Sequence, residues 1–260
     1  MADKKIIDFD PEMAASKSKE DRDRLFAEQE EFIRDFKFDK KTAGVFDDMV
    51  DRSVPFYGEI QRMISELAGD FAVPGTRLFD LGCATGNSLL AVDRTVDENV
   101  SLVGIDNSPE MLAKAESKFT QAGMKHTYQL VESDLENYRD FDNASVALMV
   151  LTLQFIRPLQ RQRIITDVYN GLNPDGALIL VEKLSFGSTL LNRLFIKYYY
   201  ELKRRNGYSE TEIAQKREAL ENVLIPYRYE ENAEMLKEVG FRYVDQFFRW
   251  YNFCGIVAVK

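Results

Sequence analysis

The sequence predicts an α/β fold whose central sheet is mostly parallel. Short apolar runs alternate with segments of helical periodicity from residue 77 to residue 183. A glycine-rich turn, Gly82 to Gly86, directly follows the first run, and Asp106 and Asp134 follow the next two. Strands that alternate with helices form parallel sheets with right-handed crossovers, and ligands bind at the carboxyl ends of such strands. The turn and both carboxylates are therefore expected at one edge of the sheet.

Two helices are expected before the sheet. Apolar residues recur at helical spacing between Val45 and Val50. Pro55 suits the first turn of a second helix, for which Ser53 is a plausible N-cap. This second helix would bring Tyr57 toward the mouth of the first strand.

The remaining elements follow from apolar runs bounded by turn residues and from helix starts such as Ser108-Pro109. Strands are expected at 77–81, 101–105, 126–131, 145–151 and 177–183, and helices at 86–95, 109–121 and 159–172. The runs 241–249 and 251–259 predict an antiparallel hairpin that closes a seven-stranded sheet. Between the fifth strand and this hairpin lies a long helical insertion, about 184–240.

The domain organisation is one large domain with an extension before it. Residues 1–37 carry alternating charges and few apolar residues. We expect a disordered opening that passes into a solvated helix near Asp21 to Phe36. Residues 38–260 are long enough to form a single α/β domain with a substantial core.

Aromatic and basic residues meet in the insertion and allow several interpretations. They are Phe195, Tyr198, Tyr199, Tyr200, Lys203, Arg204 and Arg205. Stacking and positive charge together suggest single-stranded nucleic acid. An aromatic core face beside a solvated basic face is favoured, and a lid or a dimer contact remains open.

The composition excludes several classes of function. The chain of 260 residues has a formal net charge of −9, which disfavours direct binding to nucleic acid. No apolar run reaches the roughly 18 residues of a membrane span, and no signal peptide begins the chain, so a cytoplasmic protein without membrane association is expected. Two cysteines and a single histidine offer no metal-ligand spacing, so no metal is expected. His126 is expected to be solvated rather than catalytic.

The glycine-rich turn and the two carboxylates describe a nucleoside site. An acidic side chain at the tip of the second strand, Asp106, can accept hydrogen bonds from both hydroxyls of a ribose. The spacing differs from the G-x-G-x-x-G fingerprint of dinucleotide sites. The run DLGCATG with Asp106 and Asp134 instead resembles the cofactor site of class I S-adenosylmethionine-dependent methyltransferases, in which the later acidic residue lies beside the adenine. A Rossmann-like class I methyltransferase fold is therefore expected.

Longer motifs resemble one family within that fold, the carboxy-S-adenosylmethionine synthases. The matching motifs are RSVPFY from Arg52, DLGC from Asp80, IDNSPEM from Ile105, TLQF from Thr152, GLNPDGALIL from Gly171 and NGYSETEIAQKREALENV from Asn206. The last is far more specific than the glycine turn. The resemblance runs from about Phe38 to Lys260, so the N-terminal extension lies outside it.

The resemblance implies a reaction of S-adenosyl-L-methionine with prephenate that gives carboxy-S-adenosyl-L-methionine and phenylpyruvate. It implies that the product supplies carboxymethyl groups to a partner enzyme that modifies the wobble uridine of tRNA, and that the chain forms a homodimer. Cofactor contacts are implied for Tyr57, Gly82, Cys83, Ala84, Asp106, Asn107, Asp134, Leu135 and Val150, and Arg217 would hold the added carboxylate, reaching across a dimer interface. The family has asparagine where this chain has Val150, which offers only its main chain. No side chain is assigned as a catalytic acid or base.

Two other functions fit the same residues. One is an ordinary small-molecule methyltransferase, and the other is a cofactor-binding accessory subunit without turnover. Lys183 and Arg204 are candidates for contacting the carboxylates of prephenate, because both are expected near the strand edge.

Overall fold

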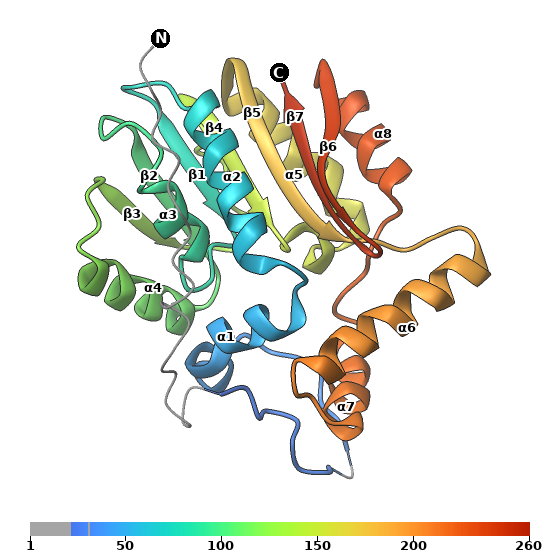
Figure 1. Cartoon of the computed structure of the whole chain (residues 1–260). Helices are drawn as coiled ribbons and strands as arrows, with labels where there is room; N and C mark the ends of the chain where they lie inside the picture. Colours follow the sequence, from blue (N-terminus) through green and yellow to red (C-terminus); the bar gives the residue numbers. More distant parts are fainter. Residues whose placement is uncertain (1–21, 31) are drawn as a thin grey trace.

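The computed structural model describes residues 22–30 and 32–260 and builds them around a seven-stranded sheet (Figure 1). The strands are β1 (Arg77–Leu81), β2 (Ser101–Asp106), β3 (Tyr128–Glu132), β4 (Ala144–Val150), β5 (Leu172–Lys183), β6 (Tyr243–Trp250) and β7 (Phe253–Val259). Their order is β3-β2-β1-β4-β5-β7-β6. The first five run parallel, whereas β7 is antiparallel to β5 and to β6. The predicted mostly parallel sheet with a C-terminal hairpin is confirmed.

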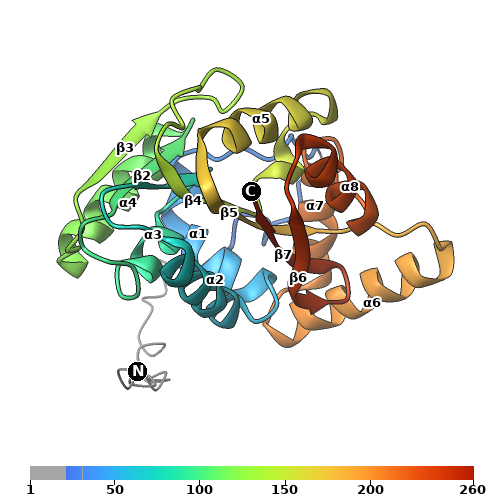
Figure 2. The same cartoon turned by 90° about the horizontal axis from the view of Figure 1, so that it is seen from above.

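Helices cover both faces of the sheet and its carboxyl edge. Their bounds are α1 (Lys40–Ser53), α2 (Tyr57–Phe71), α3 (Asn87–Val92), α4 (Pro109–Ala122), α5 (Pro158–Gly171), α6 (Thr189–Arg205), α7 (Glu210–Leu220) and α8 (Tyr229–Val239), with a 3₁₀ turn η2 (Leu153–Phe155) after β4. Helices α2, α3 and α4 pack on one face, and α5 and α8 on the other (Figure 2). Helices α1, α6 and α7 lie beyond the carboxyl ends of the parallel strands (Figure 1). The insertion therefore covers the edge at which ligands bind.

The core lies in two layers because successive strand residues point to opposite faces. Leu78 belongs to the apolar cluster that includes residues of α2 and α3, whereas its neighbour Phe79 belongs to the cluster that includes residues of α5 and α8. Both side chains are fully buried. Full burial of one such side chain contributes about 1.5–3 kcal/mol, so the central strands hold the sheet between its helices.

The boundary between the first two helices differs from the prediction. Helix α1 continues through Ser53, whose hydroxyl donates to the Met49 carbonyl instead of capping a new helix. Helix α2 begins only at Tyr57, after Phe56 turns the chain at φ 53°. By contrast, Ser108 accepts a hydrogen bond from the Met111 N–H at the start of α4, as predicted.

The solvated helix predicted near Asp21 to Phe36 is wrong for the residues that the structure describes, which contain no helix between 22 and 39. This segment runs along α7 and bonds to it instead. The Gln215 amide group donates to the carbonyls of Phe26 and Glu28, and its oxygen accepts from the Glu30 N–H. These backbone groups are satisfied by a distant side chain, so no helical ladder is needed. The disorder predicted for the opening falls on residues 1–21, outside the described part.

His126 is buried, not solvated as predicted. It is 3% exposed, and its Nδ1 lies 2.7 Å from Asp93 Oδ1 while Nε2 lies 3.0 Å from the Asp97 carbonyl oxygen. Hydrogen bonds to the ring hold the pKa of Asp93 below its usual value, although burial acts the other way. His126 therefore connects the residues before β3 to the end of α3.

Arg161 on α5 is a buried cation that shapes the turn after β4. It donates to the carbonyls of Ile156 at 2.9 Å, Gln154 at 3.3 Å and Ile225 at 2.6 Å. Its charge lies near Glu182, whose pKa burial raises to about 8.

Replacing Arg161 with methionine is expected to lower the free energy of unfolding by about 3–5 kcal/mol, because three carbonyls and a carboxyl lose their buried partner. Urea unfolding followed by circular dichroism measures this. Arg163→Met on the same helix removes a half-exposed ion pair and should cost less than about 1 kcal/mol. Equal losses in the two variants would refute the structural role of Arg161.

In the part of the chain that the structure covers, no helix has both the length and the apolarity that crossing a bilayer requires.

Candidate functional site

A cavity of about 680 Å³ lies at the carboxyl ends of the parallel strands, beneath α1, α6 and α7. This volume lies within the usual range of small-molecule sites. Every residue for which the sequence analysis expects a cofactor contact lines it: Tyr57, Gly82, Cys83, Ala84, Asp106, Asn107, Asp134, Leu135, Val150 and Arg217. The fold thus brings the whole predicted set into one cavity.

The glycine-rich turn after β1 needs glycine at two positions. Gly82 has φ +75°, and a Cβ there would lie 2.5 Å from the Thr152 side chain. Gly86 has φ +77°, and a Cβ there would lie 2.4 Å from the Phe119 ring. Left-handed backbone and close packing therefore coincide, which explains why the turn can lie against both β4 and α4.

Asp106 connects the tip of β2 to this turn. One carboxylate oxygen accepts from the Ala84 N–H and the other from the Ser108 N–H, both at 2.9 Å. Burial nevertheless raises the pKa of Asp106. Asp106 lines the cavity, so its carboxylate can accept ribose hydroxyl groups with the lone pairs that the backbone N–H groups leave free.

A second acidic residue, Asp47 of α1, ties the turn to the helix above it. It accepts hydrogen bonds from the Thr85 hydroxyl at 2.6 Å and the Asn87 amide at 3.0 Å, and pairs with Lys118 at 2.8 Å. The same Asn87 amide donates to the Tyr57 hydroxyl at 3.2 Å. This network places the Tyr57 ring at the cavity wall. No sequence signal marked Asp47, because its partners come from other elements.

Asp80, near the end of β1, is another cavity residue to which the sequence motifs gave no role. It is 2% exposed and lines the cavity, and among the described residues it has no hydrogen-bond partner. Burial, and then the nearby Asp106, raises its pKa to about 8. A cationic ligand group beside Asp80 would stabilise the ionised form.

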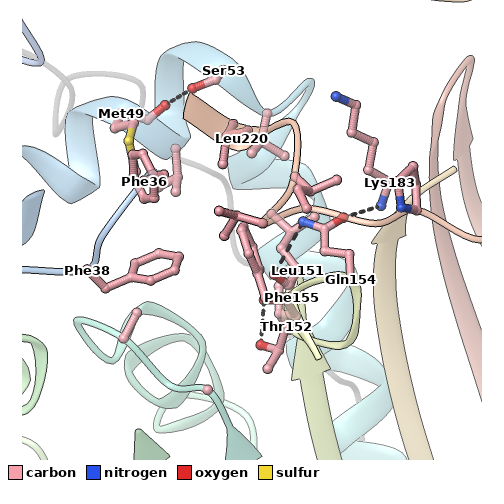
Figure 3. A pocket seen from close by; sticks show the side chains of 18 of the residues that line it. Phe36, Phe38, Met49, Ser53, Leu151, Thr152, Gln154, Phe155, Lys183 and Leu220 are labelled. Carbon is pink, nitrogen blue, oxygen red and sulfur yellow. Dashed lines mark hydrogen bonds between the residues drawn. The ribbon is translucent and has the colours of Figure 1, made fainter. Parts of the chain in front are cut away.

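The chain turns sharply after β4, next to Val150, the position at which the family has asparagine. The Val150 carbonyl accepts from the Thr152 hydroxyl at 3.3 Å, and Leu151 has φ 60°, a strained conformation for leucine. Gln154 closes the turn, since its side-chain oxygen accepts from the Lys183 N–H at 2.9 Å (Figure 3). An amide from Gln154, and not from position 150, therefore joins β4 to β5 at the cavity.

The far end of the cavity is basic. Lys183, Lys203 and Lys216 line it, and Lys203 and Lys216 are only 5% and 6% exposed. The solvated basic face predicted for α6 is therefore wrong for Lys203, because this helix turns that residue inward beside the buried Tyr199. Arg204 does point outward, pairs with Glu201 and Glu210, and lies outside the cavity lining.

Two further cavity residues, Cys83 and Arg217, differ in exposure and in charge. Burial raises the pKa of Cys83 well above its usual value, so this thiol is neutral and a poor nucleophile. Arg217 projects from α7 and is exposed although it lines the cavity. Among the described residues, no group of three or more His, Cys, Asp or Glu side chains is arranged to hold a metal ion.

Comparison with known proteins shows the type of domain and the relatives of this chain. Residues 78–176 match the model of a methyltransferase domain. The chain is 56% identical to the carboxy-S-adenosyl-L-methionine synthase of Methylococcus capsulatus over 240 residues, which is 92% of this chain and 99% of that protein. It is 43% identical over 245 residues to the synthase of the same name from Wolinella succinogenes, covering 92% of this chain and 98% of that one.

Solved structures are similar in fold. A Methanococcus maripaludis protein assigned to the S-adenosyl-L-methionine-dependent methyltransferases superposes with a TM-score of 0.59 at 20% identity, covering 89% of this chain and 97% of that one. Human N-acetylserotonin methyltransferase superposes with a TM-score of 0.56 at 15% identity, covering 85% of this chain and 55% of that one. The predicted class I methyltransferase fold is confirmed.

Proposed function

The chain belongs to the carboxy-S-adenosyl-L-methionine synthase family, and from that premise we propose that it carboxylates S-adenosyl-L-methionine with prephenate as the carboxyl donor. Its relatives are named as synthases and its domain is of the methyltransferase type, so the chain is an enzyme of the transferase class. The donor, the fate of the product and the residues in contact with either substrate are the proposal.

The observation that carries the proposal is the division of the cavity into an acidic and a basic end. Asp80, Asp106 and Asp134 lie at the ends of β1, β2 and β3, whereas Lys183 ends β5. S-adenosyl-L-methionine brings a sulfonium and an ammonium group, and prephenate brings two carboxylates. An ordinary methyl transfer has no need of clustered cations at the acceptor end, so the basic end favours a dianionic co-substrate.

We propose that the acidic end holds the cofactor. Asp106 accepts the ribose hydroxyls, Asp134 and Leu135 lie beside the adenine, and Gly82 to Ala84 let the ligand approach the backbone. Tyr57 and Asn107 line the same part of the cavity. Asp80 is proposed to accept from the cofactor's ammonium group, which would give this buried carboxylate the cationic partner that it lacks.

The proposed reaction needs enclosure more than a strong side-chain base. The bond from the prephenate ring to its carboxyl carbon breaks, and the electron pair aromatises the ring as the ring hydroxyl departs. That hydroxyl takes a proton from the sulfonium methyl group and leaves as water. The methylene carbanion then bonds to the released carbon dioxide, which gives phenylpyruvate and the carboxylated sulfonium. A closed cavity keeps carbon dioxide next to the carbanion.

Arg217 is proposed to bind the new carboxylate. A guanidinium matches a carboxylate with two charge-assisted hydrogen bonds. We further propose a cytoplasmic homodimer in which Arg217 can act in its own subunit or reach into its partner. Leu190 and Leu191, exposed on the protruding α6, offer apolar surface for such contact. A tRNA-modifying enzyme that transfers the carboxymethyl group to a wobble uridine is the proposed consumer of the product.

Incubation of the pure chain with S-adenosyl-L-methionine and prephenate tests the proposal. Mass spectrometry should show a cofactor heavier by one carboxyl group and an equal amount of phenylpyruvate. S-adenosylhomocysteine as the sole cofactor product would indicate an ordinary methyltransferase. Ligand binding without turnover would indicate an accessory subunit, and either result would overturn the proposal.

A further inference from the structure

The three lysines at the basic end form a cluster built from different elements. Lys183 ends β5, Lys203 comes from the last turn of α6, and Lys216 from α7. The ammonium groups of Lys183 and Lys203 lie 4.7 and 4.8 Å from the centre of the Tyr199 ring. The ammonium groups of Lys216 and Lys203 lie 5.4 and 6.0 Å from the centre of the Tyr208 ring. In Figure 3 the Lys183 side chain is extended, and its amino group points away from Gln154 and toward α1.

In the described part of the chain, only one of the three amino groups of the cluster has an acidic partner. Lys216 pairs with Asp23 at 3.4 Å, and the Asp23 carboxylate also accepts from the Tyr208 hydroxyl at 2.6 Å. Within the described residues, neither Lys183 nor Lys203 has a hydrogen-bond or ion-pair partner for its ammonium group. Buried lysines without partners lower stability, and here they persist in a chain of net charge −9. Such a cluster is typical of a site that receives an anion.

The lysine cluster lies away from the side chains that are proposed to hold the nucleoside. Along the sheet, β2 is followed by β1, β4 and β5, so Lys183 lies three strand spacings from Asp106. At roughly 4.8 Å per strand this amounts to about 15 Å. A nucleoside held by Asp106 and Asp134 therefore occupies the other half of the cavity. The lysines are left to the second substrate.

We propose that Lys183, Lys203 and Lys216 form the subsite that binds a carboxylate of the co-substrate, the one that remains on the released keto acid. This inference rests on the proposed function, because it takes a dicarboxylate as the second substrate. Arg217 then receives the carboxylate that is transferred, and the lysines hold the one that is not. The Tyr199 ring lies beside the ammonium groups of Lys183 and Lys203, and its electron-rich face attracts both cations.

The subsite predicts how the affinity for the co-substrate depends on pH. Burial, and then Lys216, lowers the pKa of Lys183 to about 8. Burial also lowers the pKa of Lys216, although Asp23 acts the other way, and lowers the pKa of Lys203 well below its usual value. Lys183 is therefore charged below pH 8 and loses its charge as the pH rises. The KM for prephenate should therefore rise at least about threefold between pH 7.5 and 9 in the wild type. The assay uses saturating S-adenosyl-L-methionine, so that the cofactor's ammonium group pairs with Asp80, whose own pKa is about 8. The rise should be smaller in the Lys183→Met variant, in which only Lys203 and Lys216 remain, and an unchanged wild-type profile would argue against the subsite.

Lys203→Met and Lys183→Met test the proposal directly. Each variant should raise the KM for prephenate at least about tenfold, while the dissociation constant for S-adenosyl-L-methionine changes less than twofold. Each should keep or raise the melting temperature, because a buried amino group without a partner is removed. If a lysine had only a structural role, its replacement would lower the melting temperature and leave the KM for prephenate unchanged. Arg204→Met is the matched control, since Arg204 adjoins Lys203 in sequence but lies outside the cavity.

The outcomes separate the subsite from the proposed function. If the wild type forms product and both lysine variants keep their KM for prephenate, the subsite is wrong and the function stands. Loss of S-adenosyl-L-methionine affinity instead would assign the lysines to the cofactor carboxylate and also overturn the subsite. If the wild type forms no product, calorimetric titration with prephenate decides. Weaker binding in Lys203→Met then supports the subsite although the proposed reaction fails, and equal binding refutes it.

Discussion

Arg217→Leu should reduce formation of carboxy-S-adenosyl-L-methionine by at least about a hundredfold. The two charge-assisted hydrogen bonds that leucine cannot make contribute on the order of 1.5–3 kcal/mol each. The release of phenylpyruvate should fall less, because carbon dioxide formed without a guanidinium to hold it can escape before it is captured. The ratio of carboxylated cofactor to phenylpyruvate, measured by mass spectrometry, is therefore the decisive quantity.

Two comparisons make this result specific. Arg217→Lys keeps a charge without the planar fork and should give an intermediate ratio. Arg204→Leu changes an exposed arginine outside the cavity and should leave the ratio at the wild-type value. If Arg217→Leu still couples the two products one to one, Arg217 does not hold the transferred carboxylate.

Asp106→Leu should weaken binding of S-adenosyl-L-methionine by at least about a hundredfold. It removes the proposed ribose acceptor and leaves the N–H groups of Ala84 and Ser108 without their partner. Hydrogen bonds to a charged group contribute about 1.5–3 kcal/mol each, so loss of two is at least about 3 kcal/mol. A thermal shift titration measures the effect, because a bound ligand stabilises the folded state by an amount that grows with the logarithm of the ratio of ligand concentration to dissociation constant.

The control for this variant is Glu132→Gln. Glu132 pairs in register with Asp106 on the neighbouring strand, but it is exposed and does not line the cavity. Its variant should bind the cofactor as the wild type does. If Asp106→Leu also binds normally while remaining folded, the nucleoside does not lie at the tip of β2.

Much of the site followed from local pattern because parallel strands bring their carboxyl ends to one edge. Knowing that Gly82, Asp106 and Asp134 each follow a strand was enough to expect them together, and all line the cavity. Two of the wrong predictions concern side chains whose burial depends on packing between elements. His126 is buried because α3 ends beside it, and Lys203 is buried because α7 and Tyr199 close over it.

Periodicity and motifs within short stretches of chain predicted the succession of strands and helices, the glycine-rich turn and the family. Which charges meet depends on how distant segments pack. Asp47, Asp80 and the lysines of three separate elements are far apart in the sequence, and their protonation and partners depend on what is buried around them. Burial is a property of the packed molecule, so the electrostatic division of the cavity emerges only when the chain is folded.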